Sequence, residues 1–171
     1  VAATNPCPCG WHGDRDHGCR CSRSQRQRYW QKLSGPLLDR LDLQLRLERR
    51  SATAIRGCLN RKTTATQDAW LEPRNITAAR QRMTERNPEG VCNRDLTAHN
   101  LGSHGRFEAS ALQLWERLVA RRRLSTRSGI RLLRVARTVA DLNDKDHVNV
   151  DAVAEASGFR CADLLQLESV T

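Results

Sequence analysis

The feature that most constrains this chain is a pair of closely spaced cysteine doublets near its start. Cys7-Pro8-Cys9 and Cys19-Arg20-Cys21 place four thiols at the two ends of a nine-residue segment. Four soft ligands suit Zn²⁺, which prefers a tetrahedral site, and such a closed site braces a loop without doing chemistry. C-x-C is less typical of zinc sites than C-x-x-C. His12 or His17 as a substitute ligand, a reversible disulfide and unligated thiols therefore remain alternatives.

Helix-favouring composition dominates the chain after Ser51, where the alternating pattern of a strand stops and a helical second domain is predicted to begin. Short strands are predicted only before it, at residues 1–6 and at 41–47, where leucines alternate with polar residues. A loop is expected at 7–22, and loops or weak turns are expected at 62–74 and 87–107. The helices are expected near residues 24–33, 37–40, 52–60, 75–86, 109–123, 126–142 and 150–157.

The charge balance favours an anionic partner. The formal net charge is +10, and all but three of the 29 basic residues are Arg, whose planar fork matches phosphate and carboxylate oxygens. Between Arg117 and Arg137 there are eight basic residues and no acidic one. At 100° per residue the helix near 126–142 should have an apolar face and an opposite face carrying Arg127, Arg131, Arg134 and Arg137. The alternative is a solvated cationic surface without a partner.

Nothing in the sequence indicates a membrane span or a signal peptide, so the cytoplasm is the expected compartment. The chain opens on Val1 with a strand-like run that stops at Asn-Pro. It is therefore expected to be a fragment that begins within a strand.

Three polar residues are candidates for phosphate chemistry, each with a structural alternative. Asn5 can offer its amide to a water or phosphate beyond a strand end, or can simply form an Asn-Pro turn. Arg40 can reach a neighbouring subunit's phosphate, or pair with Asp39 or Asp42. Arg127 lies in the first turn of a helix that Ser125 can cap, where anions are favoured, or is a solvated arginine. No G-x-x-x-x-G-K-[ST] loop or acidic Walker B run occurs.

The cysteine doublets and the segments that carry Asn5, Arg40 and Arg127 occur in a recognisable order. The run from Asn5 to Gly10, the second Cys doublet, the run from Leu33 to Leu43 and the stretch from Leu124 to Leu142 resemble Mg-chelatase-like AAA+ ATPases of the ComM/YifB type. The resemblance implies a mainly α chain. Residues 1–50 would be the C-terminal part of an α/β AAA+ nucleotide-binding core, with the Cys-rich loop at 7–21, and residues 51–171 would form its helical lid.

Site roles also follow from the resemblance. It implies Asn5 as sensor 1, Arg40 as the arginine finger of a neighbouring subunit, and Arg127 as sensor 2, in contact with the γ-phosphate of ATP. It implies Cys7, Cys9, Cys19 and Cys21 as the family's Cys pairs, with a structural Zn²⁺. ATP and Mg²⁺ would act in the complete protein, a ring hexamer would form, and DNA would be remodelled as in natural transformation. The fragment alone would be inactive.

Two features depart from the family. The stretch from Lys62 to Gly105 follows it poorly, and Cys92 stands where Leu is usual, which predicts a core position for Cys92. A rival hypothesis from another class is a non-enzymatic, zinc-stabilised basic module that binds nucleic acid.

Overall fold

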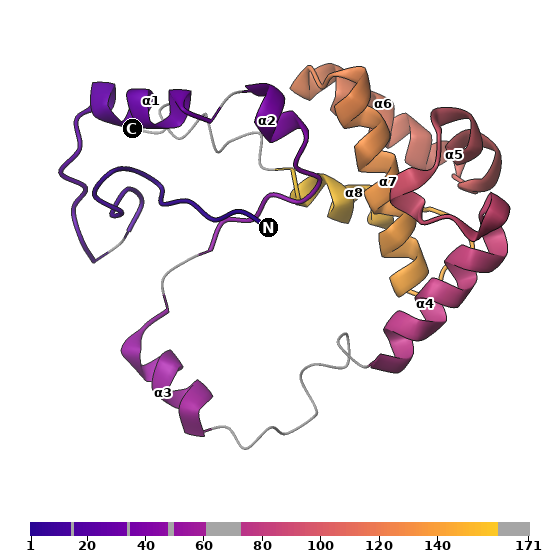
Figure 1. Cartoon of the computed structure of the whole chain (residues 1–171), viewed down its shortest axis with the longest axis horizontal. Helices are drawn as coiled ribbons and strands as arrows, with labels where there is room; N and C mark the ends of the chain where they lie inside the picture. The colour runs from indigo at the N-terminus through magenta and orange to yellow at the C-terminus, as the bar shows by residue number, and fades with distance from the viewer. Residues whose placement is uncertain (15, 34, 48–49, 61–72, 161–171) are drawn as a thin grey trace. The chain divides into compact units, whose positions relative to one another are not determined.

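The computed structural model describes residues 1–14, 16–33, 35–47, 50–60 and 73–160 of the chain (Figure 1). These residues fall into two compact units, which are described separately. Unit 1 comprises the described residues within Val1–Leu41 and Arg46–Arg61, and unit 2 those within Asp42–Leu45 and Lys62–Cys161. None of the described helices combines the length and the apolar character that a membrane span requires.

Unit 1 consists of a loop over residues 1–22 followed by three helices, α1 (Arg23–Gln31), α2 (Gly35–Asp39) and α3 (Ala52–Asn60). α1 begins at a capping box. The Ser22 hydroxyl accepts a hydrogen bond from the Gln25 N–H, and the Gln25 side chain accepts one from the Ser22 N–H. Two free amides of the first turn are thereby satisfied, which fixes where the helix starts.

Two aromatic side chains attach α1 to the loop before it. The Trp30 ring N–H donates to the Pro6 carbonyl at 3.0 Å, and the Tyr29 hydroxyl lies 2.9 Å from the Thr4 hydroxyl. Among the described residues of unit 1, Cys7 is the only buried apolar side chain. This unit therefore has no hydrophobic core to hold it, and its order must come from another source.

Unit 2 is a helical bundle arranged around α7 (Thr126–Leu142). α7 packs against α8, α4, α6 and α5, and against the 3₁₀ turn η3 (Asn93–Asp95). A single parallel bridge between Phe107 and Val148 joins the segments that precede α6 and α8. The remaining elements are α4 (Pro73–Arg86), η2 (Pro88–Gly90), α5 (Ala98–His104), α6 (Ala109–Arg122) and α8 (Val150–Gly158).

The apolar face of α7 forms the centre of the core. Leu132, Ala136 and Ala140 are buried with residues of α6 and α8, while Leu133 faces a second cluster with Leu96 and Leu101. The sequence fixes both ends of the helix. The Ser125 hydroxyl accepts from the Ser128 N–H at the start. At the end, Lys145 N–H donates to the Ala140 carbonyl beyond the left-handed Asp144, which is a Schellman arrangement.

The predicted helices are confirmed, with ends that differ by no more than a few residues. One other expectation is wrong in part. Residues 87–107 were expected to be loops or weak turns and do contain the short turns η2 and η3, but they also contain the helix α5, which starts where the Thr97 hydroxyl accepts from the Asn100 N–H. The expected loop at 62–74 lies largely outside the described residues, and its last two positions begin α4.

The described residues contain no strand, so the strands predicted at 1–6 and 41–47 are not formed. Leu43, Leu45 and Leu47 are 56%, 63% and 88% exposed. In this segment Gln44 N–H donates to the Phe159 carbonyl at 2.7 Å, but no neighbouring strand completes a ladder. An amphipathic strand needs such a neighbour to satisfy its backbone and bury its leucines. The α/β core implied by the resemblance therefore remains a prediction.

Candidate functional site

The four cysteines of the two doublets form one compact cluster in unit 1. Their sulfur atoms all lie within 4.8 Å of one another. Cys7 Sγ is 3.3 Å from Cys9 Sγ and 3.7 Å from Cys19 Sγ, and Cys9 Sγ is 3.6 Å from Cys19 Sγ. These separations exceed a disulfide bond of about 2.0 Å, and all four cysteines are free. The structure thus brings together every Cys ligand that the sequence predicted.

The sulfur spacing fits a tetrahedral metal ion. With Zn–S bonds of about 2.3 Å, the edges of a ZnS₄ tetrahedron are about 3.8 Å long, close to the three distances given above. Neither histidine of the loop belongs to the cluster. His17 stacks on Trp11 with ring centroids 4.3 Å apart, so this ring contributes to the packing of the loop. The candidate donor set is therefore four cysteine sulfurs without an imidazole.

Local backbone geometry shapes the loop that carries the first doublet. Gly10 N–H donates to the Cys7 carbonyl at 3.0 Å, and Gly10 has a φ of +81°, a conformation that favours glycine. Further along, one Asp14 oxygen accepts from the N–H groups of Asp16 and His17. These two turns reverse the chain between the doublets and allow them to meet.

Within the cluster, the pKa values of Cys9, Cys19 and Cys21 are shifted in opposite directions. The backbone N–H of Trp11 lowers the pKa of the Cys9 thiol to about 6, so this sulfur is poised as a thiolate. Desolvation raises the pKa of Cys21 to about 12, and the neighbouring Cys9 and Cys7 sulfurs act in the same direction. Desolvation also raises the pKa of Cys19. A metal ion resolves this conflict because coordinated thiols are deprotonated outright.

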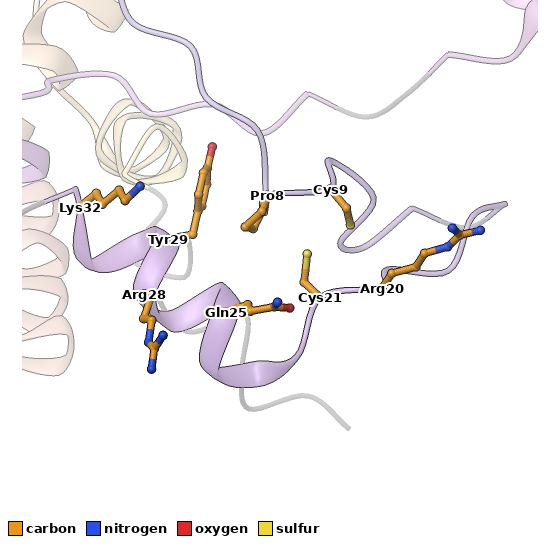
Figure 2. Close-up of a pocket in the computed structure, with 8 residues that line it drawn as sticks. All are labelled: Pro8, Cys9, Arg20, Cys21, Gln25, Arg28, Tyr29 and Lys32. Carbon is orange, nitrogen blue, oxygen red and sulfur yellow. The ribbon is translucent and has the colours of Figure 1, made fainter.

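An open groove lies beside the cysteine cluster, between the loop and α1 (Figure 2). The side chains of Cys9 and Cys21 point toward one another, with Pro8 near them, and Tyr29 projects from α1. Arg20 extends from the loop on one side, and α1 supplies the opposite side. The groove is lined by Pro8, Cys9, Arg20, Cys21, Gln25, Arg28, Tyr29 and Lys32.

Asn5 and Arg40, two of the three predicted phosphate-site residues, both lie in unit 1 and are exposed. Asn5 directly precedes Pro6 and the cysteine loop. Arg40 follows α2, where its N–H donates to the Leu37 carbonyl at 3.0 Å and continues the helical turn. The predicted strands that would place these residues at a sheet edge are not formed among the described residues.

Arg127 is exposed in the first turn of α7 in unit 2, at a helix start capped by Ser125. The other arginines expected on this cationic face have structural partners instead. Arg131 pairs with Asp42 at 2.9 Å, and Arg134 donates to the Leu96 carbonyl. Arg137 is fully buried. The prediction of a continuous cationic face on α7 is therefore wrong, and Arg127 is the member that faces solvent.

A buried polar network is the feature that sequence reasoning missed. The Asp141 carboxylate accepts hydrogen bonds from Arg137, from Arg86 of α4 and from the Asn93 amide. Burial lowers the pKa of Arg137, although Asp141 opposes this effect. In the sequence, the sign of this network was the pair Arg137 and Asp141, which lie four residues apart on a helix, next to its apolar face. Cys92, expected in the core, is exposed, and the adjacent Asn93 is buried in its place.

The chain matches two family models over most of its length. Residues 72–160 match the model described as magnesium chelatase, subunit ChlI C-terminal, and residues 1–55 match magnesium chelatase, subunit ChlI. An uncharacterized protein of Mycobacterium tuberculosis is 34% identical over 94% of this chain. The uncharacterized protein YifB of Escherichia coli is 32% identical over 96%, and competence protein ComM of Haemophilus influenzae 31% over 94%. The chain spans about 30% of the length of these relatives.

Proposed function

Since this chain belongs to the magnesium chelatase ChlI family of AAA+ ATPases, with YifB-like and ComM-like relatives, we propose that it is part of an ATP-driven motor that remodels nucleic acid. In this proposal the chain supplies residues that respond to ATP and couple its hydrolysis to movement of a helical lid. Other copies of the protein would complete the site in a ring, as a hexamer. DNA is the proposed partner, and one of the relatives is a competence protein.

Among the described residues, Arg127 gives the motor proposal its main support. It is exposed at the start of a 17-residue helix, and no acidic side chain among the described residues pairs with it. A helix start attracts phosphate through its free amides and its dipole, and a guanidinium adds a fork of donors. The other arginines of α7 are engaged elsewhere. Arg127 is therefore the residue of this helix that is available to contact the γ-phosphate of ATP.

Asn5 and Arg40 are assigned by their positions in the family pattern. We assign Asn5 the orientation of the attacking water through its amide, and Arg40 the stabilisation of transition-state charge at a neighbouring subunit's γ-phosphate. An arginine supplied in trans acts in this way because the charge that develops on the phosphoryl oxygens meets a fixed cation. Mg²⁺, when bound with ATP, would neutralise further phosphate charge. Both side chains are exposed, as contacts with a separate molecule require.

The motor proposal is tested by ATP turnover in the longer protein that it requires, with and without branched DNA. Arg40→Ala should lower turnover by about 10³-fold while ATP binding is retained. Arg127→Ala should also lower turnover, and Arg117→Ala, at an exposed position of α6, serves as the matched control. Unchanged turnover in Arg40→Ala would remove this residue from the mechanism. A folded protein without any turnover would favour the rival function.

We also propose that the four cysteines hold a structural Zn²⁺. Cys9→Ser should reduce the zinc content measured by mass spectrometry and should destabilise the loop at 7–21, because the site loses one of its four ligands. Cys92→Ser is the matched control, since Cys92 is exposed and lies outside the cluster. Equal metal content in the two variants would contradict the site.

The rival function, a non-enzymatic nucleic-acid-binding module, is favoured by one observation. The cysteine cluster and a strongly basic α1 are adjacent in unit 1, and this arrangement does not require ATP. The two functions are distinguished by ATP turnover. Only the motor proposal predicts hydrolysis and its stimulation by DNA.

A further inference from the structure

α1 and the loop residues just before it carry an unusual concentration of positive charge. Between Gly18 and Leu38 the sequence contains no acidic residue, and its five basic residues are Arg20, Arg23, Arg26, Arg28 and Lys32. Arg26 is engaged locally, because its guanidinium donates to the Cys21 carbonyl at 2.7 Å. No acidic side chain among the described residues pairs with Arg20, Arg28 or Lys32. These three cations therefore remain available to an external anion.

The helix itself is not explained by core packing. None of the residues of α1 is buried, and it has no acidic residue in its first turn. Arg28 and Lys32 are four residues apart, a spacing at which like charges on a helix repel. α1 is instead positioned by its capping box and by the contacts of Tyr29 and Trp30 with the loop, and most of its other side chains are exposed.

The groove beside this helix combines cations with apolar surface. Arg20, Arg28 and Lys32 line it together with Pro8, Tyr29 and the sulfur atoms of Cys9 and Cys21 (Figure 2). The Tyr29 ring is partly exposed, and the contact of its hydroxyl with Thr4 fixes its position. Cations that neutralise phosphates, next to an aromatic ring and a proline, form the combination that binds single-stranded nucleic acid.

We propose that this groove, the α1 groove, binds the backbone of a single-stranded nucleic acid. Arg20, Arg28 and Lys32 contact phosphates, and Tyr29 and Pro8 provide a surface for a base. The proposal deepens the proposed function by locating one nucleic-acid contact of the motor, and it does not involve the residues assigned to ATP. Unpaired strands fit this groove better than duplex because their bases expose faces that can stack on the ring.

The other basic stretch of the chain is a weaker candidate. Of the eight basic residues from Arg117 to Arg137, four form hydrogen bonds or ion pairs with other groups of unit 2. Arg122 donates to the Ser157 and Arg160 carbonyls, and Arg131, Arg134 and Arg137 have the partners described above. Arg117 and Arg121 are exposed on α6. These two arginines, four residues apart, form a matched control for Arg28 and Lys32.

The experiment measures fluorescence anisotropy of a labelled single-stranded oligonucleotide of mixed sequence, titrated with the full chain over a range of salt concentrations. R28Q/K32Q should weaken binding by about tenfold. It should also lower the slope of log affinity against log salt by about 1.4, because binding without these two phosphate contacts releases fewer counterions. R20Q should also weaken binding of the oligonucleotide. R117Q/R121Q removes the same charge from α6 and should change the affinity by less than about twofold.

Each outcome of this experiment either supports or overturns the proposed binding by the α1 groove. Equal weakening by R28Q/K32Q and R117Q/R121Q would show that net charge alone drives binding and would overturn the α1 groove. Unchanged binding in R28Q/K32Q and R20Q would overturn it as well. A duplex of the same sequence that binds as tightly as the single strand would overturn the single-strand assignment. Circular dichroism and zinc content of each variant establish that it is folded.

The binding assay requires no ATP, so the two proposals fail separately. Intact binding through the α1 groove with no ATP turnover in the longer protein would overturn the motor and leave this surface standing. ATP turnover that persists while R28Q/K32Q binds normally would leave the motor standing and overturn the surface.

Discussion

At the residue scale, the two units are held by different chemistry. Unit 2 buries an ionic network in which the Asp141 carboxylate accepts hydrogen bonds from Arg86, Arg137 and Asn93. Unit 1 buries Cys7 and places three further thiols around it. In both cases polar or ionisable groups are buried, and such groups are tolerated only when every charge has a partner.

The network predicts a large difference between two aspartates of the same region. Asp141→Asn removes the charge between two buried arginines and should lower the free energy of unfolding by about 3 kcal/mol. Asp144→Asn is the matched control. Asp144 pairs with Arg82 at 2.7 Å but is largely exposed, so its loss should cost less than about 1 kcal/mol. Urea denaturation of both variants provides the measurement, and similar values would show that the network does not stabilise the bundle.

The sequence predicted some of these residues and missed others for identifiable reasons. The cysteine doublets were found because four thiols at close spacing have few explanations. Arg137 was placed on a solvated face because helical periodicity groups it with Arg127, Arg131 and Arg134. Its burial depends on Asp141 and on the carbonyls of Gly105, Lys145 and Asp146, to all of which it donates. A pattern along one helix does not report such contacts from elsewhere in the chain.

At the scale of elements, local signals determined most helix positions. Capping by Ser22, Ser125 and Asn149 sets the starts of α1, α7 and α8. α5 escaped prediction because its seven residues include Asn, Gly and two His, and so have no clear apolar period. Its order depends on tertiary packing, through the burial of Leu101 against Leu96 and Leu133. The predicted strand at 41–47 had the right period but lacks a partner among the described residues.

One contact between elements gives a second prediction. Arg122, at the end of α6, donates to the carbonyls of Ser157 and Arg160 at the end of α8, at 3.0 and 3.3 Å. A cation at these carbonyls offsets the negative end of the helix. Arg122→Ala should therefore lower the free energy of unfolding by about 1 kcal/mol.

The neighbouring Arg121 provides the control for this contact. It is exposed on the same helix, and Arg121→Ala should change the stability by less than about 0.5 kcal/mol. Thermal denaturation followed by circular dichroism compares the two variants. Equal losses would mean that Arg122 acts through helix propensity and not through the end of α8.

At the scale of the whole molecule, the two units should respond differently to loss of metal. The apolar core lies in unit 2, in two clusters built from α5 to α8, the segments between them and Leu96 just before α5. Unit 1 has no comparable core among its described residues, and the buried apolar side chain found there is that of Cys7, within the cysteine cluster. Small structures without a core require an additional constraint, and a structural metal contributes its binding energy to folding.

A strong zinc chelator should therefore unfold the cysteine loop and α1 while the bundle of α4 to α8 remains folded. Amide hydrogen exchange read by mass spectrometry should show lost protection in residues 7–33 and unchanged protection in α7 after chelation, because only the loop loses its ligand. Readdition of zinc should restore protection. Uniform loss throughout the chain, or none, would contradict the separate origins of order in the two units.

The absence of buried residues from α1 has an evolutionary consequence. A substitution in a packed helix opens a cavity or forces a clash, so selection restricts what such a helix can become. α1 is free of that restriction along most of its length, because its caps and its aromatic contacts with the loop hold it in place. Packing therefore leaves its outward residues free to change, within the limits set by what they bind, while the cysteine loop that supports it stays the same. A protein engineer could use the same freedom to rewrite this surface for a different ligand.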